Sequence, residues 1–185
     1  MAGRAPAPRS RPRGGPHARF SVVAARFNEP IVKKLVDGAV AALTAGGVSA
    51  GAIDVHWVPG SFELPLAAHH LATSGRYAGI ACVGVVIRGE TPHFEHVARE
   101  AAAGIRSVAL ATGIPVTFGL IVALSEEQAW ARAGGDVGNR GAEAAEAALE
   151  MAHFLTARTP IDRERGTRAG DPSRRSRAGT RTHKR

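Results

Sequence analysis

Cysteine is nearly absent from this chain of 185 residues, in which Cys82 is the only one. No disulfide can form within the chain, and a cluster of thiolate metal ligands is not expected. Because Cys82 lies inside an apolar run, we interpret it as a small core residue rather than a nucleophile. A lone cysteine is typical of a reducing compartment, so we expect a cytoplasmic protein.

Long apolar runs are also missing. No run approaches the roughly 18 residues that a membrane-spanning helix needs. The basic residues 1–15 are not followed by an apolar segment, so we expect no secretory signal. Apolar residues still make up 44% of the chain, which is enough for one core, and the length suggests a single domain.

The net charge of +8 is unevenly distributed along the chain. Residues 1–19 hold five Arg and no acid, and residues 156–185 hold ten Lys or Arg and three acids. The body between them, residues 20–155, holds nine basic and thirteen acidic residues and is mildly acidic. The basic character therefore comes from the two ends of the chain.

Both ends have the composition of disordered tails. Residues 1–18 are rich in Pro, Arg, Gly and Ala, and residues 157–185 contain one aliphatic side chain larger than Ala. Such segments bury too little apolar surface to offset the entropy of ordering. The tails are either arms that bind RNA or another polyanion, or solvated extensions without a partner. The folded domain is expected at 19–156.

Apolar and alternating segments in the body predict four strands, at 20–25, 53–58, 78–87 and 115–124. The run at 78–87 is apolar throughout, as in a strand whose two faces are both covered by helices. Segments with helical periodicity follow each strand. Strict alternation of strands and helices predicts a parallel sheet with right-handed crossovers.

Capping signals mark where the helices begin and end. Asn28 and Pro30 open the first helix, which ends at Gly46 and Gly47. Ser125 and Gln128 match a capping box at the fourth helix. The other predicted helices span about 62–74, 92–111 and 139–157, and a Gly-rich break at 134–138 precedes the last of them.

Chemically active side chains collect where the predicted strands end. In an open parallel sheet, ligands bind beyond the carboxyl ends of the strands. The residues at these ends combine aromatic rings, carboxylates, a guanidinium and an imidazole, which indicates a flat polar substrate: Phe27, Phe62, Glu63, Arg88, Glu90, Thr91 and His93.

His93 stands near the start of the third helix, and an imidazole ordinarily titrates in the range that proton transfer at neutral pH requires. A histidine in such a place can equally be a surface polar residue. His69, His70, His96 and His153 lie within predicted helices, where we expect them to serve packing or solvent faces. Their spacing offers no convincing set of metal ligands, so no metal site is expected.

The segment from Gly89 to Thr91 precedes a helix, whose free N–H groups and dipole favour a phosphate. Arg132, at the end of the fourth helix, can clamp the same anion, or it can simply complement the dipole of its own helix. The chain has no Walker-type loop, and no G-x-G-x-x-G motif opens the first helix. ATP and NAD chemistry therefore gain little support.

These segments resemble the lumazine synthase family. The resemblance covers roughly residues 18–155 and is carried by six segments in the order and spacing of the family. They are ARFNEPIVKKLVDGA at 25–39, VHWVPGSFELPLAA at 55–68, GVVIRGETPHFEHV at 84–97, GIPVTFGLIV at 113–122, EEQAWARAG at 126–134 and GNRGAEAAEAALEMA at 138–152.

The resemblance implies a flavodoxin-like, three-layer α/β/α domain with a four-stranded parallel sheet. It also implies a transferase that needs no cofactor or metal, acting in the penultimate step of riboflavin biosynthesis. In that reaction, 5-amino-6-ribitylaminouracil condenses with 3,4-dihydroxy-2-butanone 4-phosphate. Phosphate and water are released, and 6,7-dimethyl-8-ribityllumazine forms. Holding two substrates in register should supply much of the acceleration.

The resemblance also assigns roles to individual residues. It implies His93 as the proton-transfer residue and Arg88 as a supporting residue in a salt bridge. It implies that Glu90, Thr91 and Arg132 bind the phosphate, with Phe118 and Arg132 coming from a neighbouring subunit. The pyrimidine and ribityl site is implied for Phe27, Ser61, Phe62, Glu63, Val85, Val86, Ile87 and Phe118.

Two positions depart from the pattern of the family. Asp136 stands where a Lys is frequent, whereas Arg140 keeps the positive charge of a second Lys position and is a further supporting residue. Glu90 places a carboxylate beside the expected phosphate site, unless only its backbone faces the ligand. These two acids leave a second hypothesis open, in which the chain is a non-catalytic shell or ligand-binding protein on the same fold.

Members of the family form homopentamers, and in some of them twelve pentamers build an icosahedral shell of sixty subunits. The length of the Gly-rich break favours a shell, whereas the proline-rich N-terminus, a poor edge strand, favours the pentamer. We expect at least a pentamer. Riboflavin synthase and, through the basic tails, a nucleic acid are candidate partners, and no membrane partner is expected.

Overall fold

The computed structural model describes residues 18–157. The disorder predicted for 1–18 and 157–185 falls almost wholly outside these residues. Contacts between Cα atoms divide the chain into two units, Met1–Phe154 and Leu155–Arg185. The sheet, the site described below and the helices, except for the last two residues of α5, belong to the first unit.

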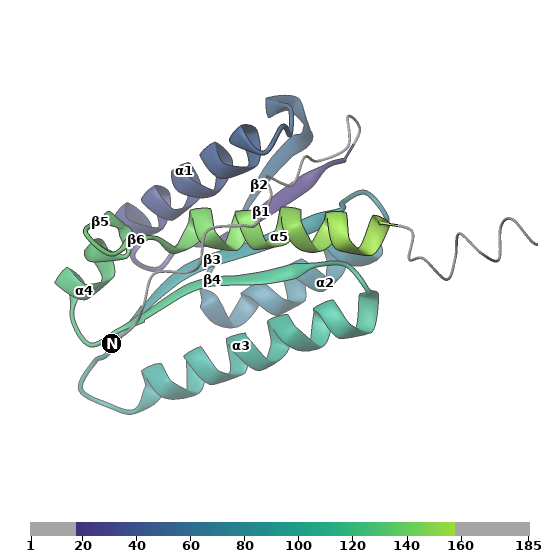
Figure 1. Ribbon diagram of the computed structural model, residues 1–185. Coiled ribbons are helices and arrows are strands. Elements are labelled where there is room, and N and C mark those ends of the chain that lie inside the picture. The colour runs from purple at the N-terminus through teal and green to yellow at the C-terminus, as the bar shows by residue number, and fades with distance from the viewer. Residues whose placement is uncertain (1–17, 158–185) are drawn as a thin grey trace, which may run out of the picture. The chain divides into compact units, whose positions relative to one another are not determined.

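Four parallel strands form the central sheet, as the alternating pattern predicts. They are β1 (Phe20–Ala25), β2 (Ile53–Val58), β3 (Gly79–Ile87) and β4 (Val116–Ala123), in the spatial order β2-β1-β3-β4. This is the flavodoxin-like order, with the change of direction between β1 and β3 (Figure 1). The observed ends lie within one residue of the expected ones.

Helices cover both faces of the sheet. The chain places α1 (Glu29–Ala45) and α5 (Arg140–Thr156) on one face, and α2 (Leu64–Thr73) and α3 (His93–Thr112) on the other (Figure 1). Shorter pieces connect them: η1 (Ala50–Ala52), η2 (Ser61–Glu63), α4 (Glu126–Ala131), and a hairpin of β5 (Ala133–Gly135) and β6 (Gly138–Asn139). The result is the expected three-layer sandwich.

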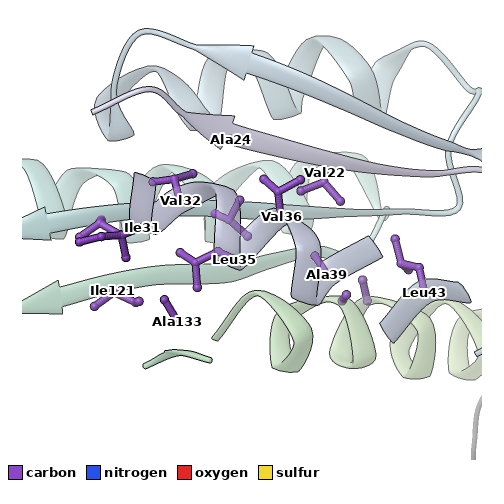
Figure 2. Close-up of a cluster of buried hydrophobic side chains, with 14 of the residues drawn as sticks. Val22, Ala24, Ile31, Val32, Leu35, Val36, Ala39, Leu43, Ile121 and Ala133 are labelled. Carbon is purple, nitrogen blue, oxygen red and sulfur yellow. The ribbon is translucent and has the colours of Figure 1, made fainter. Parts of the chain in front are cut away.

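The first core lies between the sheet, α1 and α5. Figure 2 shows side chains of α1, among them Val32, Leu35 and Leu43, packed between the strands and the small residues of α5. Alanines occupy the buried face of α5, which lets the two helices approach each other closely. At the closest point, a Cβ atom built on Gly141 would lie 2.0 Å from the carbonyl oxygen of Leu35.

The second core lies between the sheet, α2 and α3, and it contains Cys82. Burial raises the pKa of this thiol to about 12, so it is neutral and unreactive at physiological pH. The interpretation of Cys82 as a core residue is confirmed.

Two helix starts differ in detail from the sequence prediction. The helix expected from Phe62 begins with the 3-10 turn η2, and its α-helical part starts at Leu64. Ser125 caps α4 as expected, because its side chain accepts a hydrogen bond from the Gln128 backbone N–H. The Gln128 side chain accepts from the Leu124 N–H rather than from that of Ser125, which shifts the box by one residue. No helix in the described part of the chain is long and apolar enough to cross a membrane.

Candidate active site

A cavity of about 640 Å³ opens at the carboxyl edge of the sheet. This volume is ordinary for a small-molecule site. Residues from the ends of β1, β2 and β3 and from the first two turns of α3 line it: Phe27, Asn28, Gly60, Ser61, Phe62, Glu63, Val85, Val86, Ile87, Gly89, Thr91, His93, Phe94, His96, Val97 and Glu100. Nine of the residues predicted for the site are therefore together.

The end of β3 presents backbone groups to this cavity. Strand β1 pairs with β3 only as far as Val83, whereas β4 pairs with it up to Ile87. From Val85 to Ile87, the edge of β3 that faces β1 consequently has no strand beside it. At that edge the Val85 carbonyl accepts from Asn28, and the remaining N–H and C=O groups suit the alternating donors and acceptors of a pyrimidine ring.

Asn28 connects the end of β1 to the end of β3. It occupies the N-cap position of α1, but its side chain makes no capping bond, contrary to the sequence prediction. Its backbone is left-handed, with φ 58°, and its amide instead donates to the Val85 carbonyl over 3.2 Å. Asparagine tolerates this conformation better than most residues. The side chain thus builds the cavity rather than the helix end.

The turn after β2 supplies an aromatic and carboxylate wall. The absence of a side chain at Gly60 leaves room here, since a Cβ atom would lie 3.0 Å from Glu63 Oε2 and 3.4 Å from Phe27 Cδ2. The Phe27 and Phe62 rings are 72% and 61% exposed, so they are open to a ligand or a neighbouring molecule. Ser61 is 4% exposed, and its hydroxyl oxygen has no hydrogen-bond partner within residues 18–157.

Helix α3 contributes a wall that the sequence prediction found only in part. His93 lies at its first residue, as expected. His96 and Glu100 also line the cavity, so the assignment of His96 to a packing or solvent role was incomplete. Residues three and seven positions after His93 fall on the same side of a helix. This spacing is the signal in the sequence that could have identified both.

The loop between β3 and α3 places Gly89 and Thr91 on the cavity wall but not Arg88 or Glu90. The Glu90 side chain is exposed, which agrees with a role for its backbone alone. Arg88 is exposed too, and within the described part of the chain it forms none of the ion pairs. The expected salt bridge of Arg88 is therefore not formed within residues 18–157.

Phe118, Arg132 and Arg140 lie away from the cavity of their own chain. Phe118 lies on the edge strand β4, where it pairs with Cys82 of β3, and it is 44% exposed. Arg132 donates to the Gln128 carbonyl over 2.9 Å. This contact is at the end of its own helix and agrees with the alternative role, in which Arg132 complements the helix dipole. Arg140 is paired with Glu143 on the first turn of α5. If these residues serve the site, they must serve that of another subunit.

A cluster of charged and polar side chains lies at the opposite, amino edge of the sheet. Hydrogen bonds from Arg19 and then from Tyr77 hold the pKa of Asp54 below its usual value, despite partial burial. This cluster fastens the start of β1 to β2 and is structural. Among residues 18–157, no group of three His, Cys, Asp or Glu side chains is arranged to hold a metal ion.

The fold and the cavity together define an α/β enzyme with acid–base side chains at the carboxyl edge of a flavodoxin-like sheet. The family model of 6,7-dimethyl-8-ribityllumazine synthase matches residues 17–156 of the chain. The chain therefore belongs to the lumazine synthase family. It is an enzyme of riboflavin biosynthesis that condenses 5-amino-6-ribitylaminouracil with 3,4-dihydroxy-2-butanone 4-phosphate to form the lumazine.

Proposed function

We propose that the cavity at the carboxyl edge is where this condensation takes place. In this proposal, the pyrimidine ring stacks on Phe27 and its edge pairs with strand-end backbone groups of Val85, Val86 and Ile87. The ribityl chain lies against Ser61, Phe62 and Glu63. His93 transfers protons at the reacting carbons. The two substrates are held side by side, so that a bimolecular reaction becomes effectively unimolecular.

The observation that carries the proposal is the set of unused polar groups in the wall. Among residues 18–157 the buried hydroxyl of Ser61 has no partner, and past Val83 the backbone of β3 has no strand on its β1 side. Buried polar groups are costly unless they are hydrogen-bonded. A substrate with ring amides and ribityl hydroxyls would satisfy both sets of groups.

Phosphate would bind at the loop that opens α3. Gly89 and Thr91 line the cavity there, and the N-terminal N–H groups of this 20-residue helix favour an anion. Among residues 18–157, no Arg or Lys lines the cavity. We therefore assign the cationic partner to Arg132 of a neighbouring subunit, with Phe118 of that subunit closing the pocket.

Exposed apolar residues at both edges of the sheet support a head-to-tail ring. The β4 side exposes Phe118, Val122, Leu124 and Trp130, and the β2 side exposes Val55 and Trp57. Two different patches on opposite edges suit a heterologous interface, which closes into a ring when the rotation allows it. We propose a cytoplasmic homopentamer with sites between its subunits, and we leave the sixty-subunit shell as a further step of assembly.

Replacing Arg132 by alanine is expected to raise the KM for the phosphorylated substrate much more than it lowers kcat. A charge-assisted hydrogen bond contributes about 1.5–3 kcal/mol, which corresponds to roughly tenfold to a hundredfold in KM. Steady-state kinetics with each substrate varied in turn would measure this. The KM for the aminopyrimidine should change little.

Arg106→Ala is the matched control, because this arginine is an exposed residue of α3 outside the cavity lining. Arg132→Lys should fall between the wild type and the alanine variant, since it keeps the charge and loses the bidentate geometry. An unchanged KM for the phosphorylated substrate in Arg132→Ala would remove Arg132 from the site.

A further inference from the structure

The cavity contains two imidazoles, and the assigned roles use only one of them. His93 and His96 both line the cavity, and they lie three residues apart on α3. Three residues of α-helix advance by about 4.5 Å, so the second imidazole sits one turn farther from the loop that opens the helix. Glu100 continues the same line one turn beyond His96.

Arg99 holds His96 in a defined state. Its Nη2 lies 3.3 Å from His96 Nδ1, and its Nε lies 3.5 Å from Glu100 Oε1. A guanidinium can only donate hydrogen bonds, so Nδ1 of His96 must be the acceptor. The proton of the neutral ring is then on Nε2, because the bond made by one ring nitrogen fixes the tautomer of the other. His93 has no such partner among the side-chain hydrogen bonds of the described residues.

We infer that His96 is a second proton-transfer residue of this enzyme, responsible for the first condensation, while His93 acts on the step that releases phosphate. This inference rests on the proposed location of the active site. Two imidazoles one turn apart suit the phosphorylated ketone, whose carbonyl carbon is two carbon–carbon bonds from the carbon that bears the phosphate. With the phosphate at Gly89 and Thr91, His93 is the nearer imidazole to the leaving group.

The proton balance of this step closes without another reactant. The amine nitrogen bonds to the carbonyl carbon and gives a carbinolamine that carries one hydroxyl and one N–H. Nε2–H of His96 gives its proton to the hydroxyl, the C–O bond breaks, and water leaves, while the negative charge left on the ring faces the Arg99 guanidinium at Nδ1. The imidazole regains a proton from the nitrogen as the C=N bond forms. His96 is thereby restored, and the imine passes to His93 for loss of a carbon-bound proton and of phosphate.

The charged groups that share the cavity with His96 agree with this assignment. Glu63 faces the cavity from η2 and Glu100 from α3, and Arg99 bonds His96 along the helix surface. The two carboxylates can stabilise the iminium character that develops as water departs. No cation of the described chain lines the cavity and would oppose it.

The test compares His96→Gln with His93→Gln in the full-length protein, in single turnovers with both substrates. Borohydride reduces the imine to a stable amine, which mass spectrometry counts, and phosphate release is followed in parallel. We expect His96→Gln to slow formation of the trapped imine about a hundredfold or more. In steady-state assays each KM should stay within about twofold. His93→Gln should instead accumulate imine before phosphate appears.

His70→Gln is the control, because His70 is an exposed residue of α2 outside the cavity lining. A rate of imine formation in His96→Gln equal to that of the control would overturn the inference. So would accumulation of imine in His96→Gln, since that would place His96 at a later step. If His93→Gln also behaves as the control does, the proposed site itself fails, and the two failures are thus distinguishable.

Discussion

Replacing His93 by alanine is expected to lower kcat about a hundredfold to ten-thousandfold, the range in which general acid–base catalysis contributes. The imidazole lies at the first residue of α3, lines the cavity and is exposed. It belongs to neither hydrophobic core, so its removal costs no core packing. Steady-state kinetics would measure the loss, and light scattering should find the mass of the assembly unchanged.

His69→Ala serves as the control for this prediction, because His69 is exposed on α2 and does not line the cavity. It should keep the activity of the unaltered enzyme. A kcat for His93→Ala within about threefold of that control would show that His93 transfers no proton in the rate-limiting step. A loss of activity together with a loss of assembly would instead indicate a structural role.

Replacing Gly141 by alanine is expected to have the largest effect on stability. Its Cβ atom would lie 2.0 Å from the Leu35 carbonyl oxygen and 2.7 Å from the carbonyl carbon. Both are backbone atoms of α1, so no side-chain rotation can relieve the clash, and α5 must move away from α1. Overpacking of a core typically costs 1–3 kcal/mol and occasionally more. We expect about 3 kcal/mol or more, which lowers Tm by roughly 6–12 °C in a chain of this size.

Thermal unfolding followed by circular dichroism would measure this shift. Gly51→Ala is the matched control, because a Cβ atom at Gly51 would meet nothing within 4 Å. Its Tm should stay within about 2 °C of the unaltered protein, as for most surface substitutions. A similarly small shift for Gly141→Ala would mean that α1 and α5 are not packed as closely as described.

The strands were predictable because their signal is local. Each of the four runs is apolar or alternating and is bounded by turn residues, and the observed ends agree within one residue. The side-chain contact of Asn28 could not be predicted from local sequence patterns. Its place before Pro30 indicates a capping residue, yet its amide donates to Val85, 57 residues away in sequence. That contact depends on the order of strands in the sheet, which a capping pattern does not contain.

The site followed from the rule that ligands bind at the carboxyl ends of parallel strands, which brought Phe27, Phe62 and His93 together. His96 was missed because a rule about strand ends takes no account of which face a following helix presents. In the proposed site, Phe118 and Arg132 come from a second copy of the chain. A sequence and a single chain cannot fix them by physical argument alone.

Mixing two impaired variants tests most directly whether the active site lies at this cavity and is shared between neighbouring subunits. His93→Ala and Arg132→Ala would be unfolded together in equal amounts, refolded, and assayed at a low concentration of the phosphorylated substrate. In a head-to-tail ring, random assembly gives about a quarter of the sites an intact His93 and an intact Arg132 from the next subunit. The mixture should therefore recover about a quarter of the unaltered activity. A mixture no more active than the mean of the two variants would contradict a shared site.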